Sequence, residues 1–185
     1  MLNNFSMPDV LTGKKIKLIA RNNHDYDNDH WFEIDRNRNF LREYLLWVDK
    51  TISQQDVVDA TNLFIDWWNK GENYAYSIVL NETAKAIGSI DIHHIDTANH
   101  SAEIGYWLAE EYNGNGYMSE AVKIIEKQAF DEGLNRLVIK VELSNIASCR
   151  VAEKNNYILE GIHKQMLLKY DTFRDIKCFA KIKNA

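Results

Sequence analysis

Two glycines one residue apart, Gly114 and Gly116, lie in the stretch EEYNGNGYMSEA, directly ahead of a segment with helical periodicity. The first turn of a helix has backbone N–H groups without intrahelical partners at the positive end of the helix dipole. Such a loop can therefore bind an anion without a cationic side chain, and residues 110–121 contain no Lys or Arg. Glycine also tolerates positive φ and lets the backbone approach a bulky anion. The spacing indicates an anion site, and the alternative is a plain turn.

Two common phosphate motifs do not fit this loop. A P-loop requires Lys and then Ser or Thr after its second glycine, whereas Tyr117 and Met118 follow Gly116. A dinucleotide-binding fingerprint requires a third glycine at the place that Ser119 occupies. Both motifs are therefore excluded at this loop.

The segments around the loop resemble a known family. AEIGYWLAEEYNGNGYMSEA, then a strand-like segment, then NIASCRVAEKNNYILEG are similar to the acyl-CoA-binding core of the GNAT N-acetyltransferases. NRNFLREYLLWVDKT and GIHKQMLLKYDTFRDIKCFAKI resemble the branch that includes ribosomal-protein serine N-acetyltransferases. The resemblance covers most of the chain. It implies one GNAT domain over residues 1–185, an α/β (α+β) fold with a mixed, mostly antiparallel twisted sheet flanked by helices.

The resemblance implies acetyl-CoA as the coenzyme and places its diphosphate at the glycine loop. The family pattern there is Gln/Arg-x-x-Gly-x-Gly/Ala, with Asn113 in place of Gln or Arg and Met118 in place of the final small residue. Because the contacts come mainly from backbone amides, we expect these departures to change affinity rather than abolish binding. The expected contacts in the loop are Asn113, Gly114, Asn115, Gly116, Tyr117, Met118 and Ser119.

Two further segments are expected to hold the rest of the coenzyme. The exposed backbone near Trp107 and Leu108 would pair with the pantetheine arm like an added strand. Asn145 and Ser148 match the family's Asn-x-x-Ser, whose side chains meet the pantetheine and thioester end.

Acetyl transfer from a thioester to an amine needs a neutral amine, a place for the oxyanion and a proton for the thiolate. If a turn spans residues 96–100, partner residue numbers on the two strands sum to about 196. His93 then lies opposite Glu103, and Asp91 lies opposite Gly105 on the same face. Glu103 also aligns with the general base of related histone acetyltransferases. We expect Glu103 to be the base and Asp91 and His93 to contact the acceptor; the alternative is a cross-strand charge pair.

Two catalytic groups of relatives are replaced in this chain. The late-strand glutamate of the serine-acetylating enzymes corresponds to Leu167, and the helix tyrosine corresponds to Ala152. Ser148 is the expected substitute proton donor, directly or through water, unless it merely caps the helix or binds the coenzyme. An α-amino group titrates near pH 8, against about 10.4 for Lys, so a peptide N-terminus demands less of a base.

The sequence allows more than one role for several other aromatic residues and histidines. Trp47 is expected in the acceptor groove, with core packing as the alternative. Trp67 and Trp68 are adjacent on a helix, so one is expected at an edge or at a contact with a second copy, which leaves a homodimer open. His93 and His94 are adjacent on a strand and should point to opposite faces, so no metal site is expected.

Hydrophobic periodicity predicts the elements that position these residues. Strands are predicted in KKIKLIA, YAYSIVL, AIGSIDIHHI, AEIGYWL and RLVIKVEL, and a final hairpin in ILEGIHKQMLLKY and DIKCFAKIK around DTFR. One or two helices are predicted between residues 24 and 46, one over residues 117–132, and one in SNIASCRVAEKNN. Another helix is expected to start at a capping box of Ser53 and Asp56 and to end at Gly71.

The bulk composition limits the class of protein. The chain has 185 residues, of which 45% are hydrophobic and 26% charged, with a net charge of −5, which is typical of one globular domain and argues against nucleic-acid binding. No segment approaches the roughly 18 apolar residues of a membrane span, and no signal peptide is apparent, so a cytoplasmic protein is expected. Cys149 and Cys178 suggest no disulfide framework.

These observations together predict an acetyl-CoA-dependent N-acetyltransferase. The expected acceptor is the N-terminal amine of a ribosomal or other protein. The alternatives are a small amine, such as a polyamine, amino acid or aminoglycoside, and an acyl-CoA-binding sensor without turnover.

Overall fold

The computed structural model describes residues 5–183. Residues 1–4, which belong to the stretch predicted to hold no signal peptide, and residues 184–185 lie outside the described residues. Eight strands form one sheet in the order β1-β2-β3-β4-β5-β6-β8-β7. Among the strands of residues 5–183, only β5 and β6 run parallel, and the other neighbours are antiparallel. The strands are β1 (Val10–Thr12), β2 (Ile16–Ala20), β3 (Tyr74–Leu80), β4 (Ala86–Asp96), β5 (Ser101–Leu108), β6 (Arg136–Glu142), β7 (Ile158–Lys169) and β8 (Thr172–Ile182).

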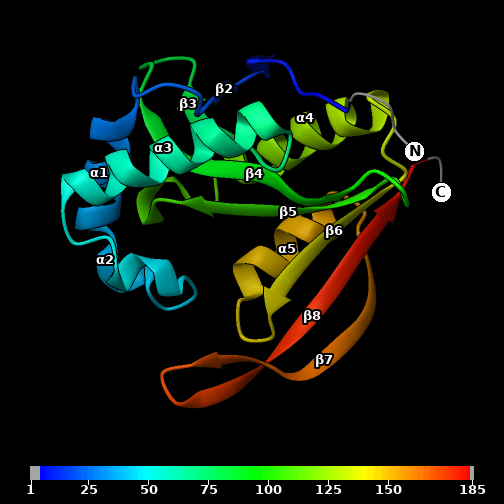
Figure 1. Cartoon of the computed structure of the whole chain (residues 1–185). Helices are drawn as coiled ribbons and strands as arrows, with labels where there is room; N and C mark the ends of the chain where they lie inside the picture. The colour runs from blue at the N-terminus through cyan, green and yellow to red at the C-terminus, as the bar shows by residue number, and fades with distance from the viewer. Residues whose placement is uncertain (1–4, 184–185) are drawn as a thin grey trace.

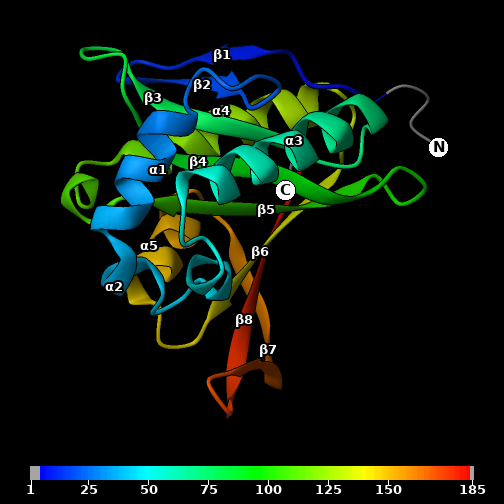
Figure 2. The ribbon, with the colours of Figure 1, turned by 60° about the vertical axis from the view of Figure 1, so that its left-hand side comes forward.

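Helices cover both faces of this sheet, as Figures 1 and 2 show. The α-helices are α1 (Asp27–Arg36), α2 (Arg38–Leu41), α3 (Gln54–Lys70), α4 (Tyr117–Asp131) and α5 (Ile146–Lys154), and the 3₁₀ helices are η1 (Leu46–Asp49) and η2 (Glu110–Tyr112). Helices α1 and α3 pack on β3 and β4, while α4 and α5 cover the opposite face. None of these helices, within residues 5–183, is long and apolar enough to cross a membrane. The predicted mixed sheet with flanking helices is confirmed.

The main core lies between the sheet and α4. Met118, Val122, Ile125 and Ala129 share the inner face of α4, as their spacing predicts, and all four are buried. Burial of this stripe fixes the start of α4 against the sheet, because apolar area removed from water is the main stabilising contribution in such a layer. The loop ahead of α4 is therefore held in place by the core.

The start of α3 is stabilised by the predicted capping box. The Ser53 hydroxyl accepts a hydrogen bond from the Asp56 N–H, and the Asp56 carboxylate accepts one from the Ser53 N–H at 2.8 Å. The helix ends at Gly71, whose φ of 70° is left-handed.

We expect Ser53→Ala to lower the free energy of unfolding by about 1 kcal/mol, because it removes this cap. For a chain of this size the loss corresponds to roughly 2–4 °C in Tm, measurable by thermal denaturation. Thr97→Ala, in an exposed turn, is the matched control and should change stability by less than about 0.5 kcal/mol. Equal losses in the two variants would show that the box adds nothing.

One strand was not predicted, and one predicted boundary was wrong. Strand β1 was missed, because three residues are too short to show an alternating pattern. The hairpin turn is the pair Tyr170 and Asp171, with φ values of 48° and 59°, rather than the four residues DTFR. Positive φ at both positions suits a two-residue hairpin turn, which normally carries Asn or Gly. The sequence gives no such signal, so the tighter turn was not predicted.

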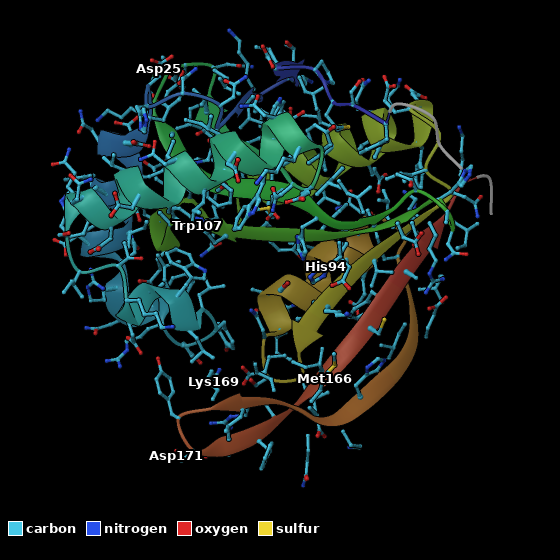
Figure 3. All side chains as sticks on the ribbon, viewed as in Figure 1. Asp25, His94, Trp107, Met166, Lys169 and Asp171 are labelled. Atoms are coloured by element: carbon cyan, nitrogen blue, oxygen red, sulfur yellow. The ribbon has the colours of Figure 1, made fainter. Side chains whose placement is uncertain are left out.

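The hairpin of β7 and β8 extends away from the rest of the sheet (Figure 1). Lys169, near its tip in Figure 3, is buried and donates hydrogen bonds to the Glu142 carboxylate and the Glu43 carbonyl. Its ammonium also lies 5.3 Å from the Tyr44 ring centroid. These contacts join the hairpin to the segment that follows α2.

Candidate active site

The site begins where β5 and β6 separate. Their parallel pairing covers only Ser101–Glu103 with Arg136–Val138, and the two strands then diverge (Figure 1). In the described residues, the edge of Gly105–Leu108 that faces β6 has no strand partner. This free edge contains the backbone near Trp107 and Leu108 that was predicted to pair with a pantetheine arm.

The glycine loop is left-handed at both glycines and leaves the space beside them open. Gly114 and Gly116 have φ values of 81° and 83°, and a Cβ added at either position would meet no atom within 4 Å. The first intrahelical bond of α4 runs from the Glu120 N–H to the Gly116 carbonyl. The N–H groups of residues 117–119 precede that bond, and no side chain of the described residues caps them. These residues fit the diphosphate of acetyl-CoA.

A cation lies beside the loop, and sequence reasoning missed it. The Lys15 ammonium donates a hydrogen bond to the Asn115 carbonyl at 3.1 Å and lies 5.8 Å from the centroid of the Tyr117 ring. The Asn115 amide donates to the carbonyls of Tyr112 and Asn113, both at 3.2 Å. Lys15 is 100 residues away in the sequence, so only the fold reveals it. The loop itself lacks Lys and Arg, but positive charge is supplied next to it.

A cavity of about 350 Å³ adjoins the loop and the free edge of β5. Six residues predicted to bind the coenzyme line it, namely Trp107, Leu108, Asn113, Met118, Asn145 and Ser148. The others, Gly114, Asn115, Gly116, Tyr117 and Ser119, lie in the adjoining loop and the first turn of α4. The far wall comes from residues 40, 41 and 43–45 around the end of α2. We call this space the coenzyme cavity.

Ser148 contacts a tyrosine in this cavity. The cap of α5 is Asn145, whose side-chain oxygen accepts the Ser148 N–H at 3.0 Å, so the interpretation of Ser148 as the cap is wrong. The Ser148 hydroxyl lies 2.9 Å from the Tyr106 hydroxyl instead. Burial raises the pKa of Tyr106 to about 12, which keeps its proton in place at neutral pH. Sequence reasoning missed Tyr106, because contact between β5 and α5 depends on the sheet order.

A row of ionisable groups lies on the other face of β4 and β5. The predicted register is confirmed, with His93 opposite Glu103 and Asp91 opposite Gly105. His93 Nδ1 is hydrogen-bonded to Asp91 Oδ2 at 2.7 Å, and His93 Nε2 lies 3.9 Å from Glu103 Oε2. A Cβ on Gly105 would come within 2.8 Å of Asp91 Oδ1 and 3.1 Å of His93 Cε1. Any side chain at Gly105 would therefore displace Asp91 or His93 from its observed position.

Neighbouring cationic groups offset the burial of Glu103. Burial is the largest cause and would raise the pKa of Glu103, but the hydrogen bond and charge of the Lys140 ammonium, 2.6 Å from Oε1, and the charges of His94 and His93 together lower it. For His93, burial lowers the pKa, but the hydrogen bond and charge of Asp91 and the charge of Glu103 raise it overall. Glu103 is therefore ionised at neutral pH. Lys140 was not predicted, because the pairing of β5 with β6 was not predicted.

His94 does not point away from His93, and that prediction was wrong. The β4–β5 register shifts between His93 and Asp96, and His94 has a φ of 49°. This irregularity brings His94 Nδ1 to 3.4 Å from Glu103 Oε1, and the two imidazole rings lie 4.7 Å apart. The cluster of His93, His94 and Glu103 could accept a metal ion. The expectation that no metal binds stays a prediction. The Lys140 ammonium supports it, because it already forms an ion pair with the Glu103 carboxylate that a metal ion would need.

A second cavity, of about 360 Å³, lies between α3 and the strands β4 and β5. Trp47 and Asp91, both predicted to contact the acceptor, line it, and Trp47 is 38% exposed, so core packing of Trp47 is wrong. The Trp47 and Trp107 rings lie 5.9 Å apart, and Figure 3 places Trp107 at the open end of β5. Trp67 also lines the cavity, whereas Trp68 packs against the core. We call this space the acceptor cavity.

The separated strands, the uncapped α4 and the open loop define a coenzyme-dependent acyltransferase. A family model described as Acetyltransferase (GNAT) domain matches residues 17–157, and the chain belongs to the GNAT acetyltransferase family. It is therefore an N-acetyltransferase with acetyl-CoA as its coenzyme, as predicted.

Similar proteins support this assignment. The chain is 33% identical over 150 residues to the ribosomal-protein-serine acetyltransferase of Escherichia coli (strain K12), covering 80% of this chain and 83% of that one. It is 27% identical over 168 residues to the uncharacterized N-acetyltransferase YoaA of Bacillus subtilis (strain 168), covering 90% and 94%. The structure of RimL, a ribosomal L7/L12 alpha-N-protein acetyltransferase in complex with coenzyme A, matches with a TM-score of 0.88 at 26% identity, covering 94% of this chain and 97% of that one.

Proposed function

We propose that the protein acetylates the N-terminal amine of a protein, with ribosomal proteins as the first acceptors to test. The observation that carries this proposal is that the two cavities adjoin, because Leu45, Tyr106 and Trp107 line both of them. Similarity to the E. coli ribosomal-protein-serine acetyltransferase and to RimL supports a protein N-terminus as acceptor. An α-amine is partly neutral near pH 8, which suits a weak base.

Acetyl-CoA supplies the activated acetyl group as a thioester. In the proposed mechanism the chain binds and orients the acceptor and moves protons. Asp91 lines the acceptor cavity, and His93 links Asp91 to Glu103. Glu103, which lines neither cavity, is ionised at neutral pH, and the proton that the amine loses reaches its carboxylate through Asp91 and His93. Because the N–H groups of β5 beside the cavity are fixed by the sheet, they can stabilise developing negative charge without reorganisation.

The hydroxyls of Tyr106 and Ser148, both in the coenzyme cavity, supply the proton for the leaving thiolate. General acids contribute roughly 10²–10⁴-fold. In Tyr106→Phe the Ser148 hydroxyl remains, so we expect kcat to fall by about 10-fold with unchanged affinity for acetyl-CoA. Steady-state kinetics measure both. Tyr26→Phe removes a hydroxyl that lines neither cavity and should match the wild type; equal kcat in all three proteins would exclude Tyr106 as a proton source.

Mass spectrometry of candidate acceptors tests the function. Purified ribosomal proteins with Ser or Ala at the N-terminus, a polyamine, free amino acids and an aminoglycoside are incubated separately with acetyl-CoA. We expect a single acetyl group on the N-terminal residue of at least one protein. An acetylated polyamine without modified protein would support the small-amine alternative, which the net charge of −5 favours. Measurement of free thiol release with every amine tests the sensor alternative. A cytoplasmic location and a homodimer stay predictions.

A further inference from the structure

Five of the fifteen residues that line the acceptor cavity are aromatic, and aliphatic side chains make up much of the rest. Trp47, Phe64, Trp67 and Trp107 contribute rings from η1, α3 and β5. Phe64 and Trp67 pack edge to face with centroids 5.7 Å apart. Two of the lining residues are also exposed to solvent: the exposed fraction is 38% for Trp47 and 53% for Leu63. Exposed apolar residues gathered around a cavity mark a ligand site more often than an ordinary surface.

The position of this cavity determines what it can hold. Because Leu45, Tyr106 and Trp107 line both this cavity and the coenzyme cavity, an amine that approaches the thioester from this cavity places its substituent among these rings. The volume of about 360 Å³ far exceeds the side chain of Ser or Ala. Filling such a space with water would leave its aromatic walls hydrated, whereas a large apolar group removes that surface from water.

Two charged residues line the same cavity. Arg21 is buried, donates a hydrogen bond to Thr61 Oγ1 at 2.7 Å, and lies 4.6 Å from the Phe64 ring centroid. Asp91 Oδ2 accepts hydrogen bonds from His93 and Asn73. Its other oxygen, Oδ1, lies over Gly105, which also lines the cavity. Oδ1 is therefore placed to accept a hydrogen bond from an amine whose substituent lies among the rings.

We propose that the acceptor carries a large apolar group, preferably aromatic, next to the reacting amine, and that this group occupies the acceptor cavity. On a protein N-terminus the group is the side chain of the first residue, which carries the reacting amine. The inference rests on the proposed acetylation of an amine. It predicts a specificity different from that of an enzyme selective for N-terminal serine.

Peptides that differ only at the first residue test this specificity. Acceptors starting with Ser, Ala, Leu, Phe or Trp, together with phenethylamine and spermidine, are compared by kcat/KM from coenzyme A release. We expect Leu, Phe and Trp peptides to exceed Ser and Ala peptides by at least about 10-fold, since apolar contacts of this size discriminate by about 10–200-fold. Equal or better use of the Ser and Ala peptides, or of spermidine alone, would overturn the inference.

Two variants connect the preference to the cavity. Ala60→Phe fills the space from α3, where Ala60 lines it, and should remove the advantage of large side chains while preserving coenzyme affinity. Phe64→Ala should weaken the aromatic preference by roughly 10-fold. An unchanged preference in both folded variants would contradict the proposal. Acetylation of phenethylamine without any peptide would support this inference while refuting the proposed protein acceptor, so the two failures are distinguishable.

Discussion

Replacement of Gly116 by valine should weaken acetyl-CoA binding by about 100-fold, or about 2.8 kcal/mol. Gly116 has a φ of 83°, where a β-branched residue is strained by roughly 1–3 kcal/mol. The surroundings of its missing Cβ are open, so the added side chain would also enter the space that the diphosphate needs. Strain and obstruction act together, because relieving the strain reorients the N–H groups at the start of α4. Calorimetric titration with acetyl-CoA measures the loss.

A matched glycine separates this effect from general destabilisation. Gly161 in β7 also has no atom within 4 Å of its missing Cβ and lacks the positive φ. Gly161→Val should bind acetyl-CoA as the wild type does, because valine suits a strand. Circular dichroism should show both variants folded. Equal affinities of Gly116→Val and Gly161→Val would contradict the role assigned to the loop.

Replacement of Glu103 by glutamine should reduce kcat by about 100-fold or more, without changing affinity for acetyl-CoA. Glutamine keeps the shape of the side chain but cannot accept a proton at neutral pH. Activity that depends on the carboxylate is present above its pKa and lost as the pH falls through it. Protonation of the acceptor amine lowers the rate below about pH 8 in both proteins. At lower pH the wild type should show a second, steeper loss as Glu103 is protonated, and Glu103→Gln should lack that second limb. An unchanged rate and profile would remove Glu103 from the mechanism.

Lys140 provides a directional check on the same claim. The Lys140 hydrogen bond and charge offset burial and lower the pKa of Glu103. Lys140→Met removes the hydrogen bond and the charge that lower the pKa of Glu103, while burial, which raises it, remains. The pKa of Glu103 should therefore rise, and its acid limb should move to higher pH. The double variant with Glu103→Gln should show no such movement. An acid limb that stays in place in Lys140→Met would show that another group sets it.

Sequence patterns predicted the local elements well but not the contacts between distant ones. The pairing of His93 with Glu103 followed from a short turn and the two-residue period of strands, and α4 followed from its apolar stripe. His94 was misplaced because an irregular register breaks that period. Periodicity describes one element at a time, so a local departure from it gives no warning in the sequence.

The site residues that the sequence analysis did not predict make contacts that depend on how distant elements pack in the fold. Lys140 reaches Glu103 because β6 pairs with β5, Tyr106 reaches Ser148 because α5 packs below the separated strands, and Lys15 reaches the glycine loop from the turn before β2. These pairs are 37, 42 and 100 residues apart. No local pattern encodes such contacts, since they depend on the whole topology.

The central claim is that main-chain N–H groups at the start of α4 hold the coenzyme diphosphate, and backbone amide NMR tests it most directly. Titration with coenzyme A should shift the amide resonances of residues 114–119 more than those of any other segment. Pantetheine, which lacks the diphosphate, should shift the amides near Trp107 but leave this loop nearly unchanged. Largest shifts elsewhere with coenzyme A, or identical shifts with both ligands, would contradict the account.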